Sequence, residues 1–135
     1  MNIEENKAVI RRYFEAMSTG NLEALDAMVD GSHVDHSSAP GSTQGLEGVK
    51  QFLRMLRAAF PDAHWDVEDL IAEGDRVAVR VTFRATHRGE FLGIPATGKQ
   101  VAMPAIAIVR LVDGRLVESW INRDRLGLMQ QLTVR

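Results

Sequence analysis

The segment Trp120–Asp124 contains residue types that can carry acid/base chemistry. Side chains of a strand alternate between its faces, so Trp120, Asn122 and Asp124 share one face while Ile121 and Arg123 share the other. The flanking pattern is typical of core, and removing an aspartate from water raises its pKa above about 3.9, toward that of a general base. Asp124 also precedes the helix-like segment 125–132, so it could instead cap that helix. At this point the two roles have equal weight.

Length and composition favour one globular domain that spans residues 1–135. The chain has no cysteine, which excludes thiolate chemistry. Its net charge of -2 argues against nucleic acid or an anionic membrane as a partner, since either would favour a concentrated basic patch. The sequence shows no leader pattern and no apolar run of membrane length. We therefore expect a cytoplasmic protein whose partner is a small molecule.

The spacing of apolar residues differs between the two parts of the chain. Residues 3–18, 22–28 and 46–60 carry apolar side chains at helical spacing, and Gly20 and Asn21 are typical of a helix end followed by a helix cap. Beyond Pro61 the period changes to two, which predicts strands near 65–71, 76–87, 101–111 and 115–123. Asp113-Gly114 is typical of a hairpin turn. Helices followed by hairpin-connected strands predict an α+β domain with helices on one face of an antiparallel sheet.

Several local motifs follow one another from the third helix to the end of the chain. They are Phe60-Pro61-Asp62, Glu73-Gly74-Asp75-Arg76-Val77, the segment from Thr86 to Lys99 with Gly93-Ile94-Pro95-Ala96-Thr97-Gly98, Glu118-Ser119-Trp120, and Asp124 to Leu132. Together they resemble the SnoaL-like polyketide cyclase, or predicted ester cyclase, family of the nuclear transport factor 2-like superfamily. The resemblance covers nearly the whole chain. It implies a cone-shaped, curved antiparallel sheet covered by N-terminal helices, the nuclear transport factor 2-like or cystatin-like fold, and a homodimer.

The resemblance also implies a reaction. The family closes a ring by intramolecular aldol addition within a polyketide-derived ester, so a small hydrophobic carbonyl-containing substrate and no cofactor are expected. The family's terminal-strand aspartate is the acid/base, and the matching residue is Asp124. Asn122 is a candidate hydrogen-bond donor to Asp124 or to an oxyanion.

Other side chains are candidates for contact with the substrate. His87 lies at the end of an apolar strand face with Phe83, where it could orient a substrate oxygen or be a packed core histidine. His36 matches a histidine frequent in the family and could reach the same cavity or lie at the surface. Trp120 and Tyr13 could line the cavity, with simple packing as the alternative for each.

Some observations leave alternatives open. The family often has a histidine at the position of Ser119 and a second proline at that of Ala96. A related hydrolase or isomerase, or a non-catalytic container for hydrophobic ligands, would use the same fold. An epoxide hydrolase would need two carboxylates beside an arginine, and the opposite strand parity of Arg123 disfavours it. The spacing in His33-Val34-Asp35-His36 lacks the context of a metal site, so no metal is expected.

Overall fold

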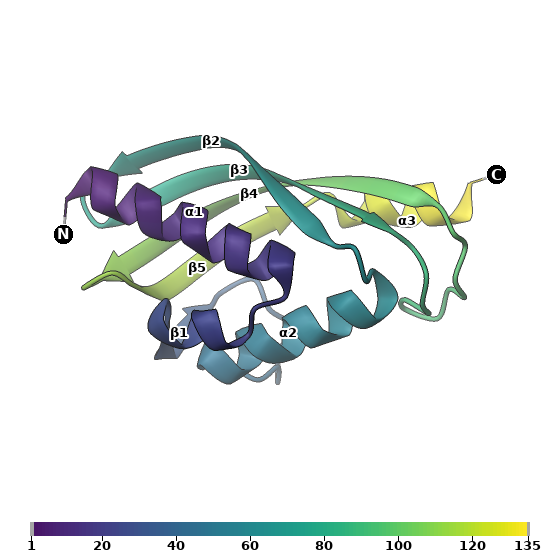
Figure 1. The fold of residues 1–135 in the computed structure, drawn as a ribbon, viewed down its shortest axis with the longest axis horizontal. Coiled ribbons are helices and arrows are strands. Elements are labelled where there is room, and N and C mark those ends of the chain that lie inside the picture. The colour runs from purple at the N-terminus through teal and green to yellow at the C-terminus, as the bar shows by residue number, and fades with distance from the viewer. Residues whose placement is uncertain (1, 135) are drawn as a thin grey trace.

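The computed structural model describes residues 2–134 (Figure 1). The first strand lies within the mainly helical N-terminal region, and four more strands and a C-terminal helix follow it. In chain order the elements are α1 (Ile3–Thr19), the 3-10 helix η1 (Glu23–Ala27), β1 (Val29–Asp35), α2 (Gly45–Ala59), β2 (His64–Glu73), β3 (Arg76–Thr86), β4 (Gln100–Val112), β5 (Arg115–Arg123) and α3 (Arg125–Thr133). None of the helices in the described range is long and apolar enough to cross a membrane.

The strands form one sheet in the order β1-β5-β4-β3-β2. The predicted α+β class and the four predicted strands are confirmed, but the expectation of a purely antiparallel sheet is wrong. Strand β1 pairs in parallel with β5, which makes the sheet mixed. The predicted second helix is only the five-residue η1. It ends at Ala27, and the chain enters β1 almost at once.

Helices α1 and α2 cover one face of the curved sheet, which we call the inner face (Figure 1). Helix α1 begins where the Asn2 side chain accepts a hydrogen bond from the Glu5 backbone N–H. It ends at Gly20, whose φ of 70° is the left-handed conformation that glycine adopts at low cost. Val9 and Ile10 of α1 pack onto buried side chains of β3 and β4. The other face of the sheet, the outer face, carries charged and exposed residues.

A bulge in β5 decides which of its side chains face inward. Around the hairpin turn Leu111 pairs with Leu116, but the next residue along β4, Arg110, pairs with Glu118 and skips Val117. One extra residue on a strand reverses the face of every residue beyond it. Residues 119, 121 and 123 therefore face inward, opposite buried Val109, Ala107 and Ala105.

Helix α3 packs Leu128 and Leu132 against the core at the far ends of the strands. Strand β5 ends at Arg123, opposite Ala105, so the earlier part of β4 has no strand partner on that side. The amide of Gln131 supplies this partner, because it accepts from Ala102 N at 2.8 Å and donates to Ala102 O at 2.7 Å. Gln131 thus satisfies an open strand edge.

Candidate functional site

Asp124 and Asn122 do not lie on the inner face. Asn122 is exposed on the outer face and pairs with Ile106. Asp124 is also exposed, and its Oδ1 accepts a hydrogen bond from Gly127 N at 2.9 Å, so it is the N-cap of α3. The expectation of a buried acid is wrong, because the β5 bulge turns the even-numbered residues outward. The helix-cap alternative describes the observed geometry.

Trp120 and His36 meet on the outer face. Their rings are stacked with centroids 4.8 Å apart, and the Arg76 guanidinium carbon lies 5.1 Å from the Trp120 ring centroid. His36 Nε2 lies 2.8 Å from a Glu118 carboxylate oxygen. Hydrogen bonds from His36 and then Arg110 lower the pKa of Glu118. The prediction that Trp120 and His36 line an inner cavity is therefore wrong, and His36 follows its surface alternative.

His87 and Phe83 lie on the inner side of the sheet, but both are buried in the core. His87 is 0% exposed, and its Nδ1 accepts from Thr97 N at 3.2 Å, which leaves the proton of the neutral ring on Nε2. Nε2 is buried with no hydrogen-bond partner. Phe83, 1% exposed, packs edge-on against Phe60. Both residues are core residues in this structure, and His87 does not share a face with Asn122.

The inner face instead brings together Tyr13, Asp35 and Arg123, which we call the inner-face cluster. Asp35 pairs in parallel with Ser119 and so shares its inward face, while Arg123 pairs with buried Ala105. Tyr13 comes from α1, where it packs against the core beneath the sheet. All three cluster residues are only partly buried. A phenol, a carboxylate and a guanidinium thus meet beside apolar surface.

The charges of Asp35 and Arg123 act on the Tyr13 phenol and on each other. Burial raises the pKa of the Tyr13 phenol to about 12, with the Arg123 charge lowering it and the Asp35 charge raising it. Burial lowers the pKa of Arg123, and the charge of Asp35 opposes that shift. Within residues 2–134 neither the Tyr13 hydroxyl nor the Arg123 guanidinium has a hydrogen-bond partner. The cluster therefore presents free donors to a ligand.

Two further groups frame the cluster. His33 Nε2 lies 2.8 Å from Ser119 Oγ, and burial lowers the pKa of His33, which favours a neutral ring. Ser119 faces inward, so its departure from the family pattern concerns this face of the sheet. His33 and His36 point to opposite faces of the sheet and do not converge on one ion. In the described part of the chain no group of three such side chains could hold a metal.

Aromatic side chains complete the surroundings of the cluster. The Arg123 guanidinium carbon lies 5.0 Å from the centroid of the Phe52 ring, which α2 supplies. Trp65 of β2 packs against all three parts of the core and is itself only partly buried. Flat apolar surface next to polar donors suits a planar carbonyl-rich molecule.

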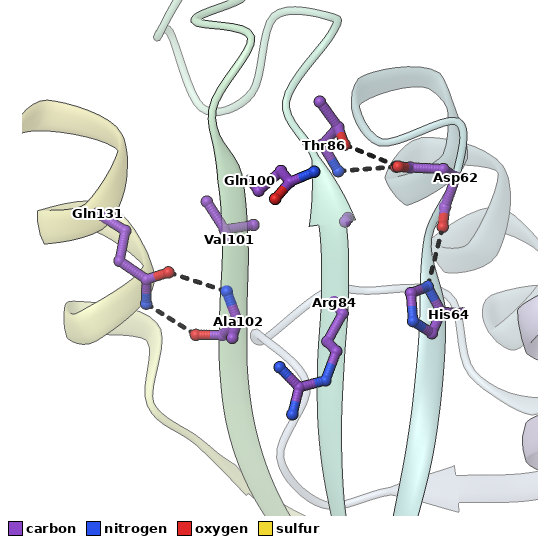
Figure 2. A pocket seen from close by; sticks show the side chains of 9 residues that line it. Asp62, His64, Arg84, Thr86, Gln100, Val101, Ala102 and Gln131 are labelled. Carbon is purple, nitrogen blue, oxygen red and sulfur yellow. Dashed lines mark hydrogen bonds between the residues drawn. The ribbon is translucent and has the colours of Figure 1, made fainter.

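An open groove of about 360 Å³ lies elsewhere, at the ends of β3 and β4 beside α3 (Figure 2). The side chains of Asp62, Arg84 and Gln131 in this groove already have partners. Asp62 accepts from the backbone N–H and the hydroxyl of Thr86, both at 2.7 Å, and these bonds lower the pKa of Asp62. Gln131 is bonded to Ala102, as described above. The groove contains none of the predicted site residues and offers no comparable set of free donors.

Asp35, His33 and Ser119 were not predicted as site residues, and Arg123 was set aside on parity. The signal that could have identified them is the hairpin at Asp113-Gly114, which fixes the pairing of β4 with β5. The bulge at Val117 hides that signal, because no turn residue or glycine marks it in the sequence.

The chain matches a family model described as SnoaL-like polyketide cyclase over residues 7–132. It is 28% identical to the aklanonic acid methyl ester cyclase DnrD of Streptomyces peucetius over 131 residues, which are 92% of this chain and 88% of that protein. The structure of TsrD from Streptomyces laurentii superimposes with a TM-score of 0.91 at 27% identity, covering 100% of this chain and 99% of that one. The structure of IdmH from Streptomyces antibioticus superimposes with a TM-score of 0.86 at 34% identity, covering 96% of this chain and 99% of that one. The chain therefore belongs to the SnoaL-like polyketide cyclase family.

Proposed function

We propose that this protein is a cofactor-independent cyclase that closes a ring in a small carbonyl-rich substrate by intramolecular aldol addition. The observation that carries the proposal is the inner-face cluster, in a chain of the SnoaL-like polyketide cyclase family. The cluster combines a carboxylate with a phenol that stays protonated at neutral pH, beside the rings of Phe52 and Trp65. These are the parts that enolate chemistry needs.

Asp35 is the base that the geometry supports best. Its Oδ1 accepts a hydrogen bond from Ser37 N at 2.8 Å, which fixes the carboxylate on the inner side of β1. In the proposed reaction Asp35 removes a proton from a carbon between two carbonyl groups, which already acidify that carbon. The enolate carbon then adds to a second carbonyl carbon of the same molecule. The resulting alkoxide takes the proton back from Asp35, so substrate and product are isomers.

Tyr13 supports the charge that develops on oxygen. With a pKa of about 12 its hydroxyl stays protonated and can donate a hydrogen bond to the enolate or alkoxide oxygen. No protein acceptor in residues 2–134 competes for this hydrogen. Tyr13→Phe should therefore lower turnover by about 10²- to 10³-fold.

The sequence resemblance implies Asp124 as the acid/base, and this remains the competing proposal. Both carboxylates accept one backbone hydrogen bond, but Asp124 is exposed on the outer face whereas Asp35 is half-buried on the inner face, so Asp35 has the better position. The two proposals are separable, because Asp→Asn at either position keeps the local backbone hydrogen bond but removes the base.

A hydrolase is the second candidate from the same cluster. Arg123 lies beside Asp35 on the inner face, so strand parity no longer argues against an epoxide hydrolase. That chemistry needs a second carboxylate beside the arginine, whereas Asp35 is the only carboxylate whose charge raises the pKa of Arg123. An aldol cyclase needs only one carboxylate.

The outer face is proposed to pair two copies of the chain. It carries Ile106 and Ile108, 56% and 42% exposed, beside the stacked His36 and Trp120. Exposed isoleucines on the flat centre of a sheet are typical of an interface. The homodimer is also the state that the family resemblance implies.

The proposed function is tested by the isomerisation of an aromatic carboxylic acid and of its methyl ester, each with a 1,3-dicarbonyl side chain and a second ketone within reach. Mass spectrometry after chromatography should show a product of unchanged mass with a new retention time, and NMR should show loss of one ketone carbon. Conversion of the methyl ester to the free acid with release of methanol would support a hydrolase instead. If no compound is converted faster than in buffer, both the cyclase and the hydrolase proposals are contradicted.

A further inference from the structure

Among the described residues Arg123 has no oxygen partner and is half-buried, whereas Arg76 of the outer face, which also has none, is exposed over the Trp120 ring. Arg80, Arg84 and Arg110 each donate to a carboxylate oxygen, at 2.7, 2.9 and 2.6 Å respectively. The Arg123 side chain packs over the Phe52 ring, and an aromatic ring offers no oxygen to the N–H groups in the plane of the guanidinium. A cation withdrawn from water without a hydrogen-bonded partner is costly unless a ligand supplies one.

Asp35 is not a hydrogen-bonded partner of Arg123. Its charge acts on Arg123, but no ion pair of 4.0 Å or less joins them within the described residues. One oxygen of Asp35 is already held by the Ser37 backbone. The guanidinium N–H groups of Arg123 therefore have no oxygen acceptor among the described residues.

We propose that Arg123 binds a carboxylate of the substrate, so that this member of the family acts on a flat, carbonyl-rich carboxylic acid rather than on its neutral ester. A guanidinium forms two parallel hydrogen bonds with a carboxylate, which an ester cannot match because it carries no charge. The inference rests on the proposed function for the location of the substrate, at the inner-face cluster. It separates this chain from DnrD, whose name gives a methyl ester as the substrate.

The position of Arg123 gives the bound acid a defined orientation. Phe52 lies against the guanidinium, so a planar ring attached to the carboxylate would extend across apolar surface toward Trp65. The carbonyl groups of the substrate would then lie near Asp35 and Tyr13. Arg123 is thus proposed as a specificity-determining residue, while Asp35 and Tyr13 act on the reacting atoms.

Binding of 2-naphthoate and of methyl 2-naphthoate, measured by isothermal titration calorimetry, tests the inference without turnover. The wild-type protein should bind the acid at least about tenfold more tightly than the ester, the size of one charge-assisted hydrogen bond. Arg123→Gln should abolish this preference and leave the ester affinity unchanged, while Arg123→Lys should keep part of it. Arg84→Gln, on the outer face, is the matched control and should bind both probes as the wild type does.

Equal affinity for the two probes in the wild type, or an acid preference that survives in Arg123→Gln, would overturn the inference. Failure of both probes to bind at millimolar concentration would also overturn it. The Nε–H signal of Arg123 in a nitrogen-proton NMR spectrum should shift with the acid and stay unchanged with the ester. If this shift and the acid preference are found but no cyclisation occurs, the proposed function fails and the binding inference stands.

Discussion

The His36 imidazole lies flat against the Trp120 indole on the outer face of the sheet, with an angle of 11° between the ring planes. Because Val34 pairs with Glu118 and Ile108 pairs with Trp120, this stack lies on the opposite side of the sheet from Asp35 and Arg123. Two aromatic side chains that the sequence suggests for a ligand cavity therefore belong to a surface. The structure separates a polar inner-face cluster from an aromatic and aliphatic outer face.

The outer face should hold two copies of the chain together. Ile108→Lys places a charge beside Trp120, and its symmetry mate would place a second one nearby. We expect the wild type to sediment as a dimer and Ile108→Lys as a monomer in analytical ultracentrifugation. Met55→Lys is the control, because Met55 is 49% exposed but lies on α2. A monomeric wild type at about 0.1 mM, where a standard-sized interface is populated, would rule out this interface.

The Tyr13 titration should report directly on the inner-face cluster. Tyr13 is the only tyrosine, so the change in absorbance at 295 nm belongs to one group. Its pKa of about 12 exceeds the unfolded value of about 10. The folded state therefore favours the protonated phenol, and the resulting stability is complete below about pH 10 and is lost as the pH rises toward 12. Urea unfolding at pH 8 and at pH 10.5 should show this loss.

Two variants identify the neighbours of Tyr13 in the same titration. Asp35→Asn removes a negative charge and should lower the pKa of Tyr13, whereas Arg123→Gln removes a positive charge and should raise it. Asp30→Asn changes the same residue type at the other end of β1 and should leave the titration unchanged. Ionisation of Tyr13 near pH 10 in the folded wild type would mean that the cluster is open to water.

Gln131 should contribute to stability through its two hydrogen bonds to Ala102. Gln131→Ala removes the partner of both backbone groups, and we expect a loss of about 1–2 kcal/mol in the free energy of unfolding. Gln130→Ala is matched in helix position and residue type and should change stability little. Chemical denaturation of the two variants gives the comparison. Equal free energies of unfolding would show that water replaces the Gln131 amide without loss.

Regular elements could be predicted from the sequence because their signals are local. The apolar stripe of α1, the left-handed Gly20 and the alternation in β3 each lie within about a dozen residues. Strand β1 could not be predicted in this way, since Gly31 and Ser32 interrupt its apolar pattern. It is stabilised by parallel pairing with β5, about ninety residues later in the chain.

The candidate site could not be predicted from the sequence, for a related reason. Strand parity correctly grouped Trp120, Asn122 and Asp124, but it cannot tell which face is inward. The bulge at Val117 settles that question, and it is a feature of pairing between two strands. Tyr13 was identified from the sequence as a candidate, while its neighbours Asp35 and Arg123 come from other elements and meet it only in the fold.

The most direct test of the account is the rate at which deuterium from the solvent enters a methyl benzoylacetate that carries a carboxylate on its aromatic ring, at the carbon between the two carbonyl groups. This exchange measures proton removal alone and can be followed by NMR. Asp35→Asn should lower the enzyme-dependent rate by about 10²- to 10⁴-fold. Asp124→Asn, which can still cap α3, should stay close to the wild-type rate. A wild-type rate in Asp35→Asn together with a collapse in Asp124→Asn would contradict the account and place the acid/base at the helix cap.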